Sequence, residues 1–378
     1  MTSVTSTTLG ETLERLCHDT IAPAAPEVDR TGAFPDRALE ALRGAGLLGA
    51  VSSREVGGLG LGPREASFIV RRVARDCGST SMVLCMHYSG VSVLEAHADQ
   101  ETRRAAASGR HLSTLAFSEA GSRSHFWAPL GTAARNGSGV VLNARKSWVT
   151  SASKATAYVW SSKPLAAEGV STLWLVPSKS PGLSVRGPFD GLGLRGNDSS
   201  PVGAENVKLP ESARLGEDGR GFDIMMGTVL PIFQVLNASF SVGAMESAVE
   251  RTAEHAAGQR YGHLDDAALA DLPAIRANIA RMRIKTDAAA TLLEDTVAAI
   301  TSGRADAMLR VLECKAMAGE TANEVLDLAM RTCGGQAFRK EVGVERLFRD
   351  ARAAGVMSPT TDLLYDFIGK AVCGLPLF

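Results

Sequence analysis

The sequence lacks a charge excess of either sign and has few aromatic residues. Its 378 residues carry a formal net charge of −1, and only 5% of them are aromatic. Nucleic-acid binding needs a clustered positive excess, so we expect no nucleic-acid partner. No uninterrupted apolar run reaches the length of a membrane span, so we expect no membrane insertion either. The composition that remains is that of a globular protein long enough for two or three domains.

Cysteine motifs are also absent. The six cysteines are scattered, and none stands in a CxxC pair or in a spacing typical of metal ligands. We therefore expect reduced, mostly buried thiols and no metal site. The N-terminal stretch MTSVTSTTLGETLERL has no basic region followed by an apolar core, which argues against a secretory signal. Together these features predict a cytoplasmic protein.

Hydrophobic spacing divides the chain into three parts. Residues 1–110 have apolar residues three and four positions apart, which predicts an N-terminal α-helical domain. Residues 111–217 hold short β-branched and aromatic segments separated by turns such as RNGSG, which predicts a central antiparallel β domain, a small barrel or sandwich. Residues 218–378 are helical again and predict a C-terminal four-helix bundle, with a final helix from about Thr361 to Cys373. The predicted class is α+β.

One glycine motif matches a nucleotide-binding pattern by its letters alone. GLGLRG at 191–196 fits GxGxxG, but the dinucleotide fingerprint needs a strand before it and a helix after it. Here NDSSPV follows, which is typical of a turn and a strand. The motif therefore does not predict a nicotinamide site.

Three other motifs carry more information together than singly. They are LAFSEAGSRSHF at 115–126, KSWVTSAS at 146–153 and CGGQAFRKEVGVERLFRDARAAG at 333–355. With the helix–β–helix order, they make the chain resemble the acyl-CoA dehydrogenase superfamily over nearly its whole length. The corresponding family patterns are Thr-Glu-Pro-x-x-Gly-Ser, Lys-x-Trp-Ile-Thr and Gly-Gly-x-Gly-Tyr followed by Arg-Asp-Ala. The resemblance implies the family fold and FAD bound between the β domain and the C-terminal bundle, in a homodimer or homotetramer.

The resemblance also implies contacts to the isoalloxazine ring of FAD. Phe117 and Trp148 would wall the ring, which needs a flat apolar slot. Ser118 stands where the family has a threonine hydroxyl at the pyrimidine edge, and Thr150 matches the threonine near the flavin N5. Trp148 taken alone is also compatible with simple core packing.

The phosphate end of the cofactor departs from the family pattern. Gly334 and Gly335 would let the backbone approach the FAD pyrophosphate of a neighbouring subunit, and Thr360 stands near the cofactor's phosphates. The usual pyrophosphate arginine is missing, although Arg260 could substitute at a shifted register, and Arg331 stands where a glutamine is usual. We expect modest FAD affinity, which would suit an enzyme supplied with reduced flavin by a partner reductase.

The catalytic carboxylate of the family is missing at both of its positions. The family's Glu-Gly-Thr reads SPT at 358–360, and the upstream acid–arginine pair falls at Phe233 and Gln234. There is no acid at all from 225 to 244. A neutral serine hydroxyl is far too weak a base without its own activator. Asp362 is the best surviving carboxylate, although an Asp at a helix start is also typical of a cap or a solvated residue.

The remaining candidates lie on the predicted buried helix and the first β motif. His87, in STSMVLCMHYSG, resembles the active-site histidine of the family's oxygenase branch, and histidine can pass a proton near neutral pH. A buried histidine on such a helix more often has a purely structural role. His87 and Ser358 are the predicted oxygen-positioning residues, and Tyr88 and His125 are secondary candidates that are expected to contact the substrate. Ser124 matches the family serine at the pantetheine or pyrophosphate region of CoA, and His125 replaces the adjacent aspartate.

These observations predict a FAD-dependent oxygenase or oxidase acting on a CoA- or carrier-bound acyl group or a related secondary metabolite. Phe233 and Gln234 would then contact the substrate. The first alternative is an acyl-CoA or acyl-carrier dehydrogenase whose base has moved to Asp362 or His87, with an electron-transfer flavoprotein as its partner. The second alternative is a subunit that binds an acyl thioester or flavin without turnover.

Overall fold

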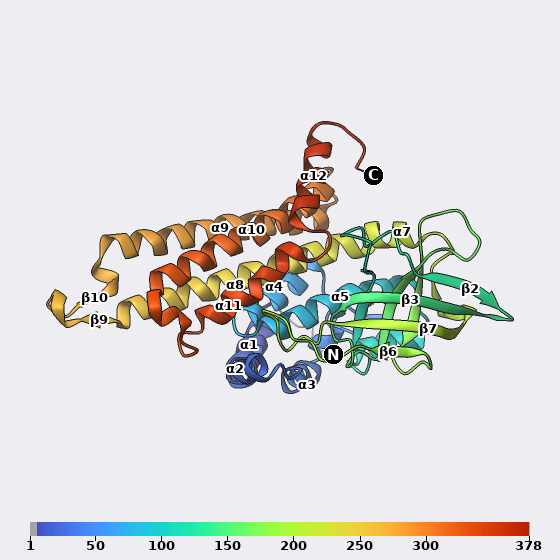
Figure 1. Ribbon diagram of the computed structural model, residues 1–378, viewed down its shortest axis with the longest axis horizontal. Helices are drawn as coiled ribbons and strands as arrows, with labels where there is room; N and C mark the ends of the chain where they lie inside the picture. The colour runs from blue at the N-terminus through green and yellow to red at the C-terminus, as the bar shows by residue number, and fades with distance from the viewer. Residues whose placement is uncertain (1–5, 378) are drawn as a thin grey trace.

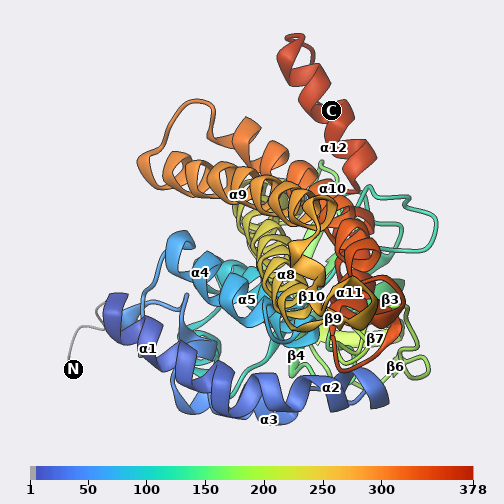
Figure 2. The same ribbon diagram turned by 90° about the vertical axis from the view of Figure 1, so that its left-hand side faces the viewer.

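The computed structural model describes residues 6–377 and confirms the predicted order of helices, strands and helices (Figures 1 and 2). The class is α+β, with an N-terminal helical domain, a middle β domain and a C-terminal helical domain. In Figure 1 the long C-terminal helices lie along the long axis of the molecule, and the β domain lies at the right-hand end.

The N-terminal part consists of six α-helices in the described chain: α1 (Ser6–Leu16), α2 (Ala22–Thr31), α3 (Asp36–Gly44), α4 (Pro63–Ala74), α5 (Gly78–His97) and α6 (Gln100–Ala107). The helix α5 is apolar on nearly every side and is buried from Gly78 to Val91. It packs against α4, α8 and the first strand, so it links all three parts of the fold. Gly90 permits this approach, because a Cβ there would lie 2.4 Å from Ser113 Oγ.

The β domain contains two four-stranded sheets among the described residues. One has the order β1 (Ser113–Ala116), β4 (Ala157–Ser162), β5 (Thr172–Pro177), β8 (Arg214–Leu215). The other has the order β2 (Thr132–Asn136), β3 (Gly139–Val149), β7 (Ser200–Pro210), β6 (Leu183–Val185). Trp160 of β4 and Trp174 of β5 are paired in the first of these sheets, and both belong to the buried core of the β domain. The pairing is antiparallel as predicted, except that β1 pairs with β4 in parallel.

The C-terminal part begins with α7 (Gly221–Ile224) and a π-helical turn, η5 (Met225–Val229), which lead into α8 (Leu230–Gly258). The bundle is formed by α8, α9 (Pro273–Ser302), α10 (Ala307–Cys333) and α11 (Val344–Val356), while α12 (Thr361–Val372) projects beyond it (Figure 2). A short hairpin of β9 (Arg260–Tyr261) and β10 (Ala267–Ala268) joins α8 to α9.

One helical stretch, Gly221–Gly258, is long and apolar enough to cross a membrane by length and composition alone. Its most apolar window is 72% buried inside the protein. It packs against α4, α5, α9, α10 and α11, so its apolar surface serves the core of the bundle.

The GLGLRG segment is a packing loop in the structure. A Cβ on Gly193 would lie 2.3 Å from the Arg349 carbonyl oxygen of α11. The Leu194 N–H donates to the buried Asp350 carboxylate at 2.6 Å, and the Gly196 N–H donates to Ser79 Oγ. The strand β7 follows, where a dinucleotide site would need a helix. These glycines therefore let the β domain approach α11 and α5 closely.

Candidate flavin and acyl site

The third strand ends in an exposed tryptophan between buried neighbours. Trp148 is 71% exposed and has a φ of +56°, whereas Lys146, Val149 and Thr150 are buried. The Thr150 hydroxyl lies 3.1 Å from Ser199 Oγ, and the Thr150 carbonyl accepts a bond from Thr114. The β3–β7 register shifts between Lys146 and Val149. The exposed indole thus lies at an irregularity of the strand pairing, where side chains are commonly reoriented.

A buried ion pair joins the two β motifs. Lys146 Nζ lies 2.5 Å from Glu119 Oε1, and both side chains are almost completely buried. The ammonium also donates to Ser161 O and Oγ, while the second Glu119 oxygen accepts the N–H groups of Leu130 and Gly131. Every charged atom is thus hydrogen-bonded, as a buried pair requires. The pair fixes the segment that carries Phe117 and Ser118 against the strand that carries Trp148.

Phe117 and Ser118 themselves lie on the chain between β1 and that pair. Phe117 is buried and stacks on Phe126, with ring centroids 6.3 Å apart and an interplanar angle of 14°. The Ser118 carbonyl accepts the Ser147 N–H at 2.9 Å. Ser118 therefore lies beside Ser147, the residue that precedes Trp148. The structure therefore brings Phe117, Ser118, Trp148 and Thr150 to one end of the β domain.

The loop at 357–360 is held by the β domain and by α10. From the β domain, Ser124 Oγ accepts the Thr360 N–H at 2.9 Å and lies 3.1 Å from Ser358 Oγ. From α10, Lys315 Nζ donates to the carbonyls of Met357 at 3.1 Å and Pro359 at 2.8 Å. The structure thus joins Ser124 to Ser358 and Thr360, which lie more than 230 positions further along the sequence.

Lys315 is a residue that sequence reasoning missed. It is 0% exposed, and within residues 6–377 its ammonium has no carboxylate partner. Burial lowers its pKa to about 7. The signal available in the sequence was one lysine inside the apolar helical stretch VLECKAMAG. An uncharged amine of this kind can hold two carbonyls without a counter-ion.

Lys315→Met should change how stability depends on pH. Unfolding returns this lysine to a pKa of about 10.4, so between pH 7 and pH 10 the unfolded chain binds more protons than the folded chain. Wild-type stability should therefore rise relative to the variant across this window, by at most about 1.4 kcal/mol per pH unit. Urea unfolding at several pH values measures this difference. Lys179→Met, at an exposed turn, is the control, and its stability should depend on pH as that of the wild type does. The same pH dependence for Lys315→Met would contradict a lowered pKa of Lys315.

The structure corrects the prediction for His87. The imidazole is completely buried, its Nδ1 accepts the Ser113 N–H at 3.0 Å, and its Nε2 donates to the Leu48 carbonyl at 2.9 Å. Burial lowers its pKa to about 4. A neutral ring with both nitrogens bonded to backbone cannot exchange protons near pH 7. Tyr88 is likewise buried and donates to the Leu47 carbonyl, so the substrate role predicted for it does not fit either.

Two further candidates lie at the surface. Asp362 is exposed in the first turn of α12, where a negative charge complements the helix N-terminus. This favours its alternative interpretation as a solvated helix-start residue over a relocated base. His125 is exposed, and its Nδ1 lies 2.9 Å from the Arg123 carbonyl while the ring contacts Trp127 edge-on. Its predicted contact with substrate stays a prediction.

Four of the residues predicted to contact the FAD phosphates lie at the opposite end of the bundle, whereas the fifth, Thr360, is in the loop at 357–360. Arg260 is in β9, at the left-hand end in Figure 1, and Arg331, Gly334 and Gly335 are exposed where α10 ends. Cys333, at the end of α10, contacts Thr252 of α8. Thr252 is 15 residues, or roughly 20 Å, along α8 from Asn237, which contacts Met357 next to Ser358. The structure does not bring these four residues together with Trp148 within one chain, which accords with a contribution to a neighbouring subunit.

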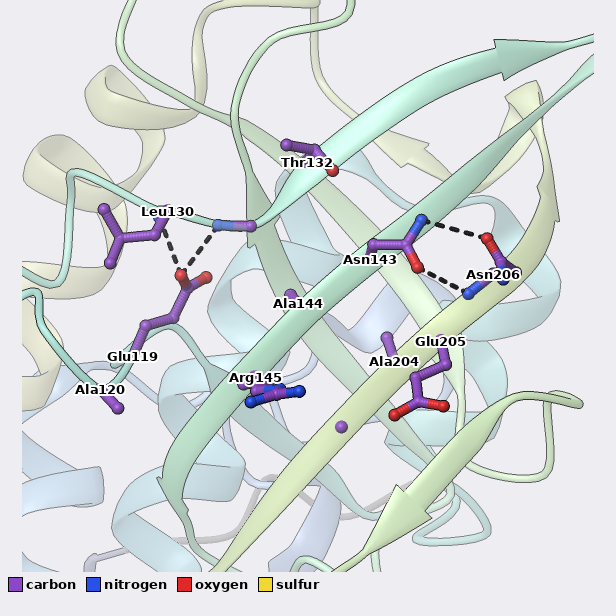
Figure 3. Close-up of a pocket in the computed structure, with 12 residues that line it drawn as sticks. Glu119, Ala120, Leu130, Thr132, Asn143, Ala144, Arg145, Ala204, Glu205 and Asn206 are labelled. Carbon is purple, nitrogen blue, oxygen red and sulfur yellow. Dashed lines mark hydrogen bonds between the residues drawn. The ribbon is translucent and has the colours of Figure 1, made fainter.

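An open groove of about 610 Å³ lies on the second sheet of the β domain (Figure 3). Arg145 and Glu205 line it, and Asn143 pairs with Asn206 along its edge. The residues predicted for the site do not line this groove. The groove therefore does not coincide with the predicted flavin and acyl site.

Family models match the chain in three consecutive blocks. The N-terminal domain of acyl-CoA dehydrogenase matches residues 5–108, the middle domain residues 114–207 and the C-terminal domain residues 219–373. The chain belongs to the acyl-CoA dehydrogenase superfamily. This confirms the resemblance on which the motif assignments depend.

Curated members of the superfamily resemble this chain over most of its length. A probable acyl-CoA dehydrogenase, YngJ, of Bacillus subtilis is 28% identical over 91% of this chain and 91% of its own length. The human mitochondrial short-chain specific acyl-CoA dehydrogenase is 28% identical over 90% of this chain and 83% of its own length. Relatives of this kind are flavin-dependent oxidoreductases, which supports an oxidoreductase here.

Solved acyl-CoA dehydrogenase folds superpose closely. Butyryl-CoA dehydrogenase from Megasphaera elsdenii has a TM-score of 0.91 at 19% identity and covers 99% of both chains. The prolyl acyl carrier protein oxidase AnaB has a TM-score of 0.87 at 18% identity, covering 97% of this chain and 99% of its own. At these identities the likeness shows the fold alone.

The superfamily implies FAD, and the residues present fit the ring end of this cofactor. The exposed Trp148 offers a flat apolar surface that suits an isoalloxazine ring, and the half-buried Ser118 lies beside the neighbouring Ser147. The Thr150 hydroxyl is buried against Ser199 Oγ. The phosphate end is not completed within one chain, because Arg260 and Arg331 lie at the far end of the bundle.

Proposed function

We propose that this chain is a FAD-dependent oxygenase or oxidase acting on an acyl group that CoA or a carrier protein holds as a thioester. One observation carries the proposal: neither family position for the catalytic base has a carboxylate. Ser358 is committed to Ser124, and Phe233 and Gln234 are buried, neutral residues. Because removal of an α-proton needs a base in hydrogen-bond reach, ordinary α,β-desaturation has no group to start it.

Each part of the site then has a defined task. Bound FAD would supply two-electron oxidation and, when reduced, reaction with oxygen. Trp148 and Thr150 hold and orient the ring, and Ser124 ties the loop at 358–360 to the β domain. Apolar side chains of α5 and α8, including Phe233, exclude water from the acyl group. His87 has no place in this scheme, since both of its nitrogens are bonded to backbone.

We also propose that the active form is a homodimer or homotetramer in the cytoplasm. The exposed Arg260, Arg331, Gly334 and Gly335 would reach the FAD phosphates of another subunit. Electrons would come from a flavin reductase if the enzyme is an oxygenase. An oxidase would take them from the acyl substrate itself, so it would need a base that neither family position supplies.

A dehydrogenase remains the second candidate, because curated relatives at 27–28% identity carry that name. It would use an electron-transfer flavoprotein as its electron acceptor. The structure does not support either relocated base expected for a dehydrogenase. Asp362 is exposed, and both ring nitrogens of His87 are hydrogen-bonded to backbone. A subunit that binds without turnover is disfavoured by the retained Trp148 and Thr150 surface.

Isotope labelling tests the proposal. The FAD-loaded protein would be incubated with acyl-CoA thioesters, a flavin reductase and ¹⁸O₂, and the products analysed by mass spectrometry. An oxygenase incorporates ¹⁸O, and an oxidase instead consumes oxygen without incorporation. If products form without any oxygen consumption, the proposal is wrong and the dehydrogenase stands.

Trp148→Ala should weaken FAD binding by roughly 10- to 30-fold, because the indole contributes about 1.5–2 kcal/mol of ring contact. The stability of the FAD-free protein should hardly change, since the side chain is 71% exposed there. Titration of flavin fluorescence measures the affinity. Ile284→Ala, equally exposed on α9, is the matched control and should bind FAD like wild type. An unchanged affinity in Trp148→Ala would remove Trp148 from the cofactor site.

A further inference from the structure

Two amide side chains on α8 are buried without matching hydrogen-bond partners. Gln234 and Asn237 are both 0% exposed and lie three residues apart, so they share one side of the helix. Within the described part of the chain, Gln234 Oε1 and Nε2 and Asn237 Oδ1 have no partner. Asn237 Nδ2 contacts only the Met357 sulfur, at 3.5 Å, which is a weak acceptor.

Other polar side chains of the same helix show how a structural role is normally satisfied. Ser239 donates to the Val235 carbonyl at 2.7 Å, and Ser241 donates to the Asn237 carbonyl at 3.2 Å. Buried polar groups are paired in the great majority of native structures, because an unpaired group forfeits its hydration without compensation. Two adjacent unpaired amides therefore need a ligand that the protein itself does not provide.

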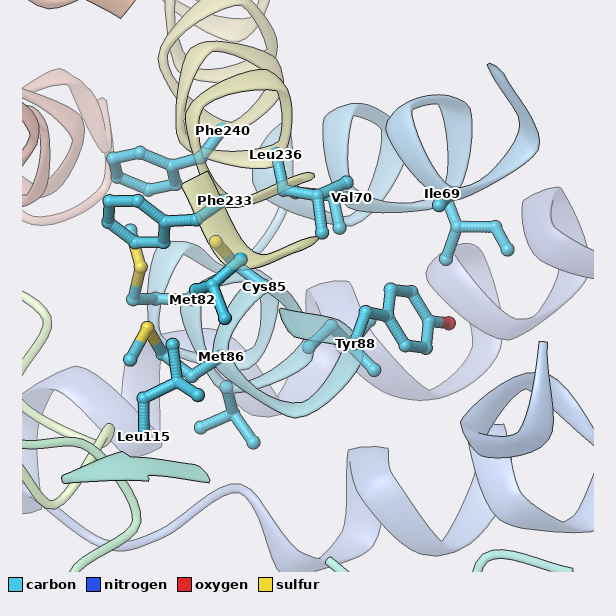
Figure 4. Packing of buried hydrophobic residues seen from close by; sticks show 14 of the residues in the cluster. Ile69, Val70, Met82, Cys85, Met86, Tyr88, Leu115, Phe233, Leu236 and Phe240 are labelled. Atoms are coloured by element: carbon cyan, nitrogen blue, oxygen red, sulfur yellow. The ribbon is translucent and has the colours of Figure 1, made fainter. Parts of the chain in front are cut away.

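Their position is next to the acyl site. Asn237 touches Met357, the residue before Ser358 at the family's base position. Phe233 and Phe240 of α8 lie beside Met82 and Met86 of α5 in the apolar cluster of Figure 4. The two amides thus stand on the helix that forms this apolar wall, at its border with the loop at 357–360.

We propose that Gln234 and Asn237 hydrogen-bond an uncharged polar group, a hydroxyl or an amide, on the acyl chain of the substrate. An amide side chain offers both donors and an acceptor, which matches a group that also has both. It offers no charge to neutralise a carboxylate. The nearby Lys315 already donates to the Met357 and Pro359 carbonyls. This inference rests on the proposed function, because it assumes that an acyl thioester binds beside Ser358.

The test compares three probes of similar length: butanoyl-CoA, a hydroxybutanoyl-CoA and succinyl-CoA. Binding to the FAD-loaded protein is followed by perturbation of the flavin spectrum and by thermal shift. Wild type should bind hydroxybutanoyl-CoA at least ~10-fold more tightly than butanoyl-CoA, because the plain alkyl chain leaves the buried amides unpaired. Gln234→Leu and Asn237→Leu should reduce this preference to about 3-fold or less.

Thermal stability without any thioester gives an independent readout. Gln234→Leu should raise the melting temperature by roughly 2 °C, since it removes two unpaired buried atoms while keeping the volume. Ser241→Ala, on the same helix, is the control and should leave the thioester preference unchanged. A lower melting temperature with an unchanged preference would make Gln234 a structural residue and overturn the inference.

The remaining outcomes separate this inference from the proposed function. Equal binding of butanoyl-CoA and hydroxybutanoyl-CoA, with oxygen-dependent turnover of either, overturns only the inference. Preference for succinyl-CoA overturns it in favour of a carboxylate-bearing substrate. If no thioester perturbs the flavin or the melting temperature, the proposed function and the inference both fail.

Discussion

Ser358→Glu should create the α,β-desaturation that the wild-type chain lacks. The motif resemblance assigns Ser358 to the family's base position, and Ser124 and Lys315 hold the loop that carries it in place. A positioned general base contributes roughly 10²- to 10⁴-fold in rate, and partial burial would raise the pKa of the new carboxyl towards neutral pH, where a base works best. Anaerobic mixing with butanoyl-CoA, followed by the loss of the oxidised flavin absorbance, measures the gain.

Two controls make this experiment decisive. Ser358→Gln has the same shape without the charge and should behave like wild type, and Ser358→Ala tests whether the serine itself contributes. If Ser358→Glu is no faster than Ser358→Gln, the acyl group does not lie beside this loop. If the wild type already reduces its flavin rapidly with butanoyl-CoA, another base is present and the enzyme is not an oxygenase.

Lys146→Met should destabilise the protein by about 3–5 kcal/mol. The substitution leaves the Glu119 carboxylate buried with only the N–H groups of Leu130 and Gly131 as partners, and an uncompensated buried charge is strongly unfavourable. FAD binding should fall as well, because the pair holds the Ser118 segment against the strand that carries Trp148. Urea unfolding of the FAD-free protein measures the first effect, and flavin titration measures the second.

A double-mutant cycle separates the loss of the pair from the loss of side-chain volume. Lys146→Met with Glu119→Gln leaves no charge inside the β domain and should recover part of the stability. Lys285→Met, which breaks the exposed pair with Glu324, should unfold close to wild type. A stability of Lys146→Met within about 1 kcal/mol of wild type would mean that water reaches the Glu119 site.

The fold could be predicted from the sequence because the apolar residues of each part follow a regular spacing. Apolar positions three and four apart and the short alternating segments place the change from helix to strand near residue 111 and back near residue 218, and both four-stranded sheets lie between Ser113 and Leu215. The direction of pairing was not accessible. Alternation marks the faces of a strand but not its neighbour, so the parallel pairing of β1 with β4 could not be read from it.

The site was accessible only in part. Motif resemblance identified Ser124, Trp148 and Ser358, and the structure brings Ser124 and Ser358 into contact across 234 positions. It could not show that His87 is bonded on both ring nitrogens, because the partners, Leu48 O and Ser113 N, are backbone atoms that carry no sequence signal. Asn237 escaped notice for a related reason, since one amide in an apolar helix has no pattern of its own.

The central claim is that oxygen, and not an electron-transfer flavoprotein, accepts the electrons of this enzyme. The most direct measurement is turnover of a CoA-thioester panel by the FAD-loaded protein, followed once in aerated buffer with a flavin reductase present and once anaerobically with an electron-transfer flavoprotein. The account predicts product only in the aerated reaction, with oxygen consumed as product forms. Product formed anaerobically with the flavoprotein would contradict it and show a dehydrogenase whose base lies elsewhere.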